Sequence, residues 1–157
     1  MPGDLTILQA ELASRELARR SYADYLALTT PGWKNTRLSR FLADTVQQFI
    51  ETQTGNAYDI LVVECPPQHG KSMSLTEAFP SWYLGKYPTN RVIEASYNEE
   101  TAERFSRRNK EKILNYGGAL FGIGIGDINR ATEFELNNHQ GRMISRAINS
   151  GLTRNPA

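Results

Sequence analysis

The chain has 157 residues, of which 39% are hydrophobic and 22% are charged, and these proportions exclude a wholly disordered protein. This length is enough for one domain with a sizeable core. Lysine and arginine together number 18 against 17 aspartates and glutamates, giving a net charge of +1. That balance excludes a uniformly basic nucleic-acid coat, so any contact with DNA requires a local patch.

Signals of cellular compartment are few. The only cysteine, Cys65, allows no intrachain disulfide and fits a reducing environment. The first residues lack the basic and apolar stretches of a secretory signal, and no apolar run approaches the roughly 18 residues that span a membrane. The sequence therefore predicts a soluble protein of the cytosol.

The first fifty-odd residues have the spacing of helices. We expect one helix from Asp4, as its cap, to about Leu28, ended by the turn residues 29–32. Three leucines share one face of it: Leu5, Leu8 and Leu12. A second helix is predicted by apolar residues that recur on one side between Leu38 and Ile50, and residues 52–56 end it.

The pattern changes in the next forty residues. The run Asp59–Cys65 is short, apolar and rich in β-branched residues, which is typical of a buried strand. A loop then leads to a helix from Lys71 to about Leu84, perturbed at Pro80. Arg91–Ala95 indicates a second strand, and Ser96 with Glu99 forms a predicted capping box for another helix.

The last part is predicted to end in a hairpin. The glycine-rich stretch 117–126 indicates a loop, and Thr132–Leu136 and Arg142–Ala147 read as two short strands around a turn. Alternation of strands and helices upstream predicts an α/β fold with a parallel sheet flanked by helices, preceded by a helical segment.

The segment Cys65–Ser72 carries the most chemical information. Its last three residues, Gly-Lys-Ser, match the end of the phosphate-binding pattern G-x-x-x-x-G-K-[ST], with Cys65 in place of the first glycine. Backbone amides here can turn toward a phosphate chain, Lys71 can reach the β- and γ-phosphates, and Ser72 can ligate magnesium. The alternative is an ordinary strand-to-helix turn with a solvated lysine. The candidate nucleotide-binding residues are Gln68, His69, Gly70, Lys71 and Ser72.

Weaker signals remain open. Basic residues crowd the helix after residue 99 and could contact phosphates, but interspersed glutamates favour a salt-bridged, solvated face. The two histidines, His69 and His139, are too isolated in sequence to indicate a metal site. Cys65 has no paired base, so packing at a strand end is favoured over nucleophilic chemistry.

Five segments together resemble the large subunit of tailed-bacteriophage terminases. They are Asn35–Leu38, Pro66–Ser72, Phe79–Pro88, Arg91–Tyr97 and Glu103–Arg108. The double-proline loop and the Phe-Pro-x-Trp-Tyr-Leu-Gly segment are the most specific of these. The similarity covers most of the chain after the first thirty residues.

The resemblance implies a P-loop NTPase-type fold and an ATP-driven DNA-packaging motor. Residues 1–56 would form a helical segment on the adenine side, and residues 57–157 an incomplete ATPase core. ATP and Mg²⁺ are the implied cofactors, with Lys71 as a catalytic residue and Ser72 on the metal. The implied partners are double-stranded DNA, the portal protein, the small terminase subunit and further copies in a homo-oligomeric ring, in the host cytoplasm and without a membrane.

The chain departs from the family in three respects. Gln68 stands where the family usually has arginine, and no apolar strand ending in paired acidic residues follows Lys71. The family's nuclease domain is also absent. We therefore expect a truncation before the Walker B strand and an isolated chain with little or no turnover. The resemblance suggests Arg154 as a catalytic arginine finger, with Arg146 as a weaker candidate.

Two other functions stay open at this point. The chain could be another P-loop ATPase, such as a helicase-like protein, although the acidic strand and motor motifs of that class are not seen. It could also be a non-catalytic module that binds nucleotide or DNA, which the missing acidic strand favours.

Overall fold

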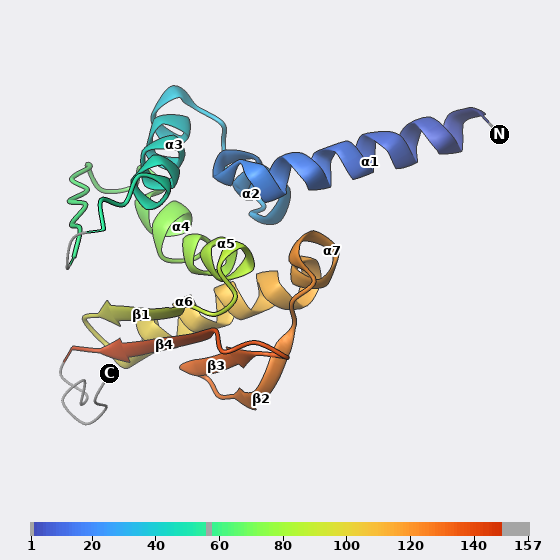
Figure 1. Ribbon diagram of the computed structural model, residues 1–157. Coiled ribbons are helices and arrows are strands. Elements are labelled where there is room, and N and C mark those ends of the chain that lie inside the picture. The colour runs from blue at the N-terminus through green and yellow to red at the C-terminus, as the bar shows by residue number, and fades with distance from the viewer. Residues whose placement is uncertain (1, 56–57, 149–157) are drawn as a thin grey trace. The chain divides into compact units, whose positions relative to one another are not determined.

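The computed structural model describes residues 2–55 and 58–148 (Figure 1). The chain forms two compact units, residues 1–74 and 75–157, and each is described by itself. The first unit is helical. The second contains a sheet with helices on it.

The first unit begins with two helices where the sequence predicted one. α1 spans Pro2–Arg20 and α2 spans Tyr22–Thr29, so the expected single helix from Asp4 is wrong. The interruption falls at Ser21, whose backbone is extended and whose hydroxyl accepts a hydrogen bond from the amide of Asp24. Ser21 therefore caps a new helix instead of continuing the old one. The expected leucine face of α1 is exposed: Leu5, Leu8 and Leu12.

The second predicted helix is confirmed as α3, Arg37–Glu51. Its N-cap is Thr36, whose hydroxyl accepts from the Ser39 amide while the Ser39 hydroxyl accepts from the Thr36 amide. Leu42 and Val46 are buried on its inner face. This reciprocal cap and the apolar stripe explain why the helix begins where it does.

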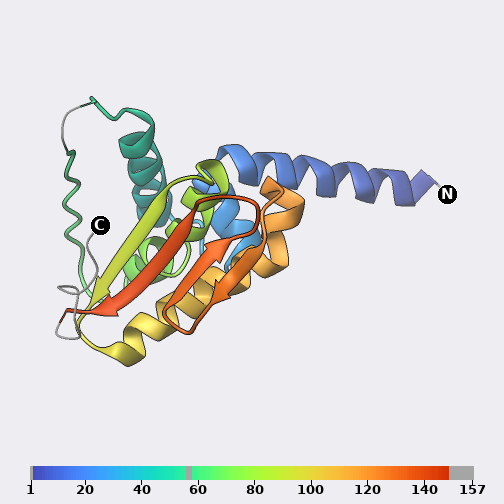
Figure 2. The same cartoon turned by 60° about the horizontal axis from the view of Figure 1, so that its bottom comes forward.

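The predicted buried strand Asp59–Cys65 is not formed. Residues 58–65 run without helix or strand structure, as a thin zigzag beside α3 (Figure 2). Ile60 and Val62 are 74% and 73% exposed. A strand exists only where a neighbouring backbone accepts and donates its hydrogen bonds, and no such neighbour lies within the described chain.

The helix predicted from Lys71 to Leu84 is also two helices. α4 spans Lys71–Leu75, and α5 spans Phe79–Lys86 with Pro80 in its first turn. Proline has no amide hydrogen and suits the start of a helix, so it begins α5 instead of perturbing a longer helix.

The second unit has a four-stranded sheet, in the order β1-β4-β3-β2. Its strands are β1 Arg91–Ser96, β2 Ile125–Asn129, β3 Glu133–Leu136 and β4 Arg142–Ala147. β1 and β4 are parallel, whereas β2–β3 and β3–β4 are antiparallel. The α/β class, the second strand and the terminal hairpin are confirmed. The expected parallel sheet is only partly present, since the hairpin supplies antiparallel strands.

α6, Glu99–Lys112, packs against β1 and β4 and is followed by a π-helical turn, Ile113–Gly117, and by α7, Gly118–Phe121. Its cap is not the predicted Ser96 but Asn98, whose side-chain oxygen accepts from the amide of Thr101. The stretch 117–126, expected as a loop, contains α7 and the start of β2. Gly122, with φ of +69°, ends α7 in the left-handed conformation that glycine favours.

The core of this unit lies on one face of the sheet. Alternate residues of β4, Met143, Ser145 and Ala147, are buried there. The apolar core consists of Leu84, Ile113, Ile123, Phe134, Leu136 and Met143. None of the helices in the described ranges is long and apolar enough to cross a membrane.

Candidate phosphate-binding site

The predicted phosphate-binding loop has an unusual backbone. Gln68 and Gly70 have φ angles of +64° and +75°, so left-handed residues stand on both sides of His69. α4 then begins at Lys71, and the Ser74 amide donates to the Gly70 carbonyl at 2.9 Å. Glycine adopts such a φ at no steric cost, whereas glutamine does so only under constraint. Backbone of this kind can turn several amides toward one anion.

His69 is oriented by the loop itself. Its Nδ1 lies 2.8 Å from the carbonyl oxygen of Pro67, to which it can donate a hydrogen bond. This contact orients the imidazole within the loop. The ring is exposed, and the described residues contain no group of three or more histidine, cysteine, aspartate or glutamate side chains that could hold a metal ion.

A cavity of about 370 Å³ lies between this loop and the segment before α3. One wall is made by the loop and α4, and the other by residues 32–39. The lining residues are Gln68, His69, Gly70, Met73 and Ser74 on the first wall, and Gly32, Trp33, Lys34, Thr36, Leu38 and Ser39 on the second. Lys34 is the charged residue among them, and none of these described residues is a carboxylate. The arrangement therefore suits an anion with an attached planar or apolar group.

Ser74 is held by two hydrogen bonds, one to the opposite wall of the cavity and one to α2. The Trp33 indole Nε1 donates to the Ser74 hydroxyl oxygen at 3.2 Å, and the Tyr22 hydroxyl donates to the Ser74 carbonyl. Tyr22 is fully buried, and burial raises the pKa of its phenol well above 10.0. Tyr22 and Ser74 were missed by sequence reasoning, because a tyrosine on a helix and a serine after Gly-Lys-Ser carry no distinctive pattern.

The two residues of the motif with the most specific expected roles are Lys71 and Ser72. Lys71 and Ser72 are exposed and are not among the residues that line the cavity. Gln68, His69 and Gly70 do line it. The structure thus brings three of the five predicted residues to the cavity and adds Trp33 and Lys34 on the opposite wall.

A second, smaller cavity of about 160 Å³ lies on the other side of His69. Its walls are mostly apolar, with Glu64, Cys65 and His69 as the ionisable residues among them. Leu38, Phe41, Leu42 and Thr45 come from α3, and residues 61–65 form the other side. The irregular segment before the loop therefore rests on α3 along one flank, where Leu61 and Val63 are half-buried.

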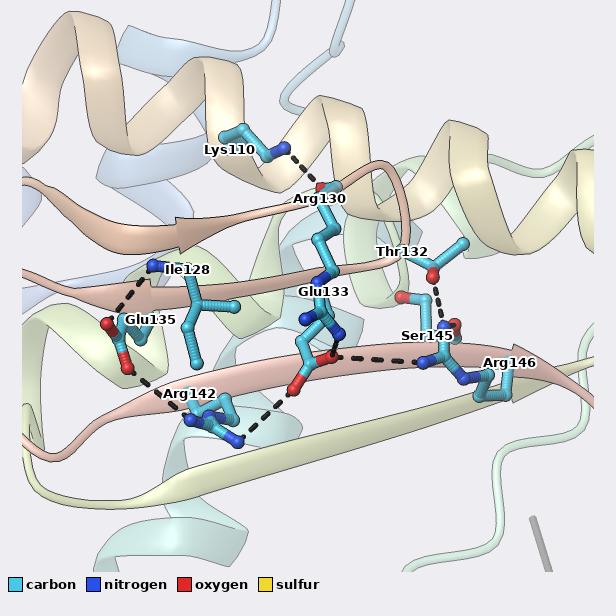
Figure 3. Close-up of polar contacts among 9 residues, drawn as sticks. All are labelled: Lys110, Ile128, Arg130, Thr132, Glu133, Glu135, Arg142, Ser145 and Arg146. Carbon is cyan, nitrogen blue, oxygen red and sulfur yellow. Dashed lines mark hydrogen bonds and ion pairs between the residues drawn. The ribbon is translucent and has the colours of Figure 1, made fainter. Parts of the chain in front are cut away.

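The second candidate arginine finger, Arg146, belongs to a network on the sheet (Figure 3). Its guanidinium donates to the Thr132 hydroxyl and lies 3.8 Å from a Glu133 carboxylate oxygen. Arg130 and Arg142 contact the same carboxylate at 3.4 and 3.2 Å. Arg146 is thus engaged within the second unit, and Arg154 lies outside the described residues.

The basic helix α6 is partly paired. Arg104 lies 3.5 Å from Glu77, and Arg108 lies 3.5 Å from Glu111. Lys112 is buried, and desolvation lowers the pKa of its ammonium. These contacts favour the salt-bridged interpretation of the helix over a phosphate-binding patch.

Glu94 is an isolated acid in the core of the second unit. It is 9% exposed, and the Ser145 hydroxyl donates to its carboxylate at 3.4 Å. Burial, with a smaller contribution from the nearby Glu77 carboxylate, raises the pKa of Glu94 from 4.5 to about 8. A carboxyl with this pKa is mostly neutral at pH 7.

Comparison with known proteins gave no match to a family model, to a curated protein or to a solved structure.

Proposed function

We propose that the cavity between residues 68–74 and 32–39 binds ATP, and that the chain is the ATPase part of a DNA-packaging motor of the terminase type. The observation that supports this most is that Gln68, His69 and Gly70 of the loop line one cavity together with Trp33 and Lys34. A loop with left-handed residues and a wall carrying an indole and an ammonium are suited to a phosphate chain and a base, respectively.

The residues present fit an anionic nucleotide. None of the described residues that line the cavity is a carboxylate, Lys34 supplies positive charge, and Lys71 directly follows the lining residue Gly70 in the chain. Mg²⁺, when bound, would neutralise charge on the phosphates, and it needs few protein ligands because phosphate oxygens and waters complete its shell. Ser72 is the residue of this loop that would contribute a hydroxyl to it.

The same composition favours binding over rapid hydrolysis. Phosphoryl transfer to water requires a group that positions the water, and among the described residues that line the cavity none is acidic. We therefore propose nucleotide binding with little turnover for this chain alone. We assign ATP turnover and a location in the host cytoplasm to the proposed motor as a whole. The proposed partners of that motor are double-stranded DNA, the portal protein, the small terminase subunit and further copies in a homo-oligomeric ring. The P-loop fold and a finger role for Arg154 are part of the same proposal.

Fluorescence titration tests the location of the site. Trp33 lines the cavity, whereas the other tryptophan, Trp82, is fully buried in the second unit. We expect Mg²⁺-ATP to change the emission of the wild type in a saturable way, and the change to vanish in Trp33→Phe while Trp82→Phe retains it. A fluorescence change that persists in Trp33→Phe and vanishes in Trp82→Phe contradicts the assignment. The absence of any change in the wild type also contradicts it.

A further inference from the structure

The wall of the cavity formed by residues 32–39 has polar groups that already bond to one another. The Lys34 carbonyl accepts a hydrogen bond from the Thr36 amide at 2.8 Å and another from the Ser39 hydroxyl. The hydroxyls of Thr36 and Ser39 lie 3.0 Å apart, and each accepts from the other residue's amide. These groups are therefore used by the turn before α3 and by its capping box.

Trp33 lines the cavity, but its polar edge is also in use. The indole Nε1 donates to the Ser74 hydroxyl at 3.2 Å, and the Trp33 amide donates to the Thr30 carbonyl at 3.1 Å. The indole face can still stack on a planar base. Stacking of this kind is possible for every base, so Trp33 does not distinguish one base from another.

The ammonium of Lys34 differs from these groups because it is not engaged. Lys34 lines the cavity, and none of the hydrogen bonds or ion pairs of the described residues uses its side chain. An ammonium has three donor hydrogens and no acceptor. It therefore favours a ligand edge that carries acceptors.

We propose that Lys34 sets the base preference of this site, and that a purine with an oxygen at position 6 binds more tightly than adenine. The inference rests on the proposed function, since it takes a nucleoside triphosphate to enter the cavity with its base on the Trp33 side. Guanine presents two neighbouring acceptors, N7 and O6, which one lysine can contact together. Adenine presents N7 beside an amino group that donates. The ammonium thus gains one acceptor with guanine and meets a second donor with adenine.

The other edge of guanine adds nothing to this preference. Its N1 hydrogen and its 2-amino group are donors, which a carboxylate would match. No carboxylate occurs among the described residues that line the cavity. Hypoxanthine has the same N7 and O6 but no 2-amino group, so it should bind as well as guanine. The site therefore selects 6-oxopurines as a class.

Two side chains of the phosphate loop also line the cavity and carry acceptors. The Gln68 carboxamide has both a donor and an acceptor, so it can turn to suit either base. His69 Nδ1 lies 2.8 Å from the Pro67 carbonyl, and when it donates there its Nε2 is an acceptor that suits the amino group of adenine. Both belong to the loop assigned to the phosphates, whereas Lys34 belongs to the wall assigned to the base. Lys34 is therefore the residue that decides the preference.

Isothermal titration calorimetry with the Mg²⁺ complexes of GTP, ITP and ATP tests the base preference. GTP and ITP should bind the wild type with equal affinity. Each should bind at least about fivefold more tightly than ATP, at the lower end of what such a contact gives, because Lys34 is exposed. ATP that binds as tightly as GTP, or more tightly, overturns this inference and leaves the nucleotide site standing. Absence of binding by all three nucleotides overturns the proposed function as well.

Lys34→Met tests whether the ammonium is responsible. The substitution keeps an unbranched side chain without donors, and the backbone carbonyl still accepts from Thr36 and Ser39. The preference for GTP over ATP should disappear in Lys34→Met and persist in Lys34→Arg, since arginine also donates to N7 and O6. A loss of affinity in Lys34→Met that is equal for GTP, ITP and ATP would place the ammonium on the phosphates and overturn the inference.

A single-atom change in the ligand tests the two-point contact. In 7-deaza-GTP a C–H group replaces N7, so this analogue should bind the wild type more weakly than GTP does. In Lys34→Met the two ligands should bind alike, because the donor is gone. Equal affinity of the wild type for GTP and 7-deaza-GTP overturns the proposed contact with N7 and O6.

Discussion

Trp33 and Ser74 are separated by 41 residues, yet the indole Nε1 of one donates a hydrogen bond of 3.2 Å to the hydroxyl of the other. This contact connects the segment before α3 to the helix that follows the Gly-Lys-Ser motif. Both residues line the same cavity. The bond therefore fixes the distance between the wall proposed to hold the base and the wall proposed to hold the phosphates.

Removing that bond should weaken nucleotide binding while the fold persists. In Ser74→Ala the Trp33 N–H loses its partner, at a cost of about 0.5–1.5 kcal/mol, or roughly 2- to 10-fold in affinity. The Tyr22 contact is to the Ser74 carbonyl and survives the change. Binding is measured by competition with a fluorescent ATP analogue. Ser39→Ala, on the opposite wall, shows whether loss of any hydroxyl has the same effect. An affinity unchanged in Ser74→Ala contradicts the role of this bond.

Gln68 is expected to be strained. Its φ of +64° is a conformation that glycine adopts without cost. Gln68→Gly should therefore leave the free energy of unfolding unchanged or raise it by up to about 1 kcal/mol, although glycine elsewhere lowers it. Gln68→Val should lower it by about 1–3 kcal/mol, because a β-branched side chain tolerates positive φ least. Urea unfolding measures both. The opposite order of stability would exclude the left-handed conformation at this position.

The buried carboxyl of Glu94 predicts a pH dependence of stability. Its pKa is raised from 4.5 to about 8 in the folded state, so the folded chain holds a proton that the unfolded chain has already lost. The stabilisation of the folded state by this bound proton is fully present below pH 4.5. It falls as the pH rises from 4.5 toward 8 and does not change further above pH 8. Each pKa unit corresponds to roughly 1 kcal/mol or more.

Glu94→Gln should remove this slope and make the protein more stable than the wild type at pH 8. The test is the free energy of unfolding measured across pH 5 to 8. Glu77→Gln is the control, since Glu77 is the minor electrostatic contributor and its removal should leave most of the slope. Equal slopes in wild type and Glu94→Gln would mean that this carboxyl is not the titrating group.

Glu133 neutralises three guanidinium groups and is the centre of the network in Figure 3. Glu133→Gln removes the charge but keeps the size, and should lower the free energy of unfolding by about 1–3 kcal/mol, because three cations then face one another. Glu135 contacts Arg142 alone among the arginines and is more exposed. Glu135→Gln should therefore cost less than about 1 kcal/mol. Thermal unfolding compares the two, and equal losses would contradict the central position of Glu133.

The sequence predicted those elements that are defined by local patterns. α3, β1 and the β3–β4 hairpin follow from apolar periodicity and caps within a few residues. The prediction of a strand at Asp59–Cys65 was wrong. β-branched residues favour an extended backbone, but strand pairing depends on a partner far away in the chain. The prediction of a loop for the glycine-rich stretch 117–126 was wrong. Packing of Ile113, Leu120 and Ile123 into the core outweighs the weak helix propensity of the glycines.

The candidate site was predictable only on one wall. Gln68, His69 and Gly70 belong to a motif with fixed spacing, whereas Lys34 has no pattern of its own and Trp33 was assigned to the adenine side only by resemblance. Ser74 bonds to Trp33 on the other wall and to Tyr22 on α2, and spacing along the sequence does not encode contacts between such distant residues. The exposure of Lys71 agrees with the alternative of an ordinary strand-to-helix turn with a solvated lysine, so this side chain is the sharpest point at which to test the site.

Isothermal titration calorimetry of Mg²⁺-ATP with the wild type and Lys71→Ala tests the central proposal most directly. A charge-assisted contact with phosphate contributes about 1.5–3 kcal/mol, so the variant should bind roughly 10- to 150-fold more weakly, while Lys86→Ala, at the end of α5, binds like the wild type. Wild type and Lys71→Ala binding ATP with equal affinity, or neither binding it at all, would contradict the assignment of this loop to phosphate.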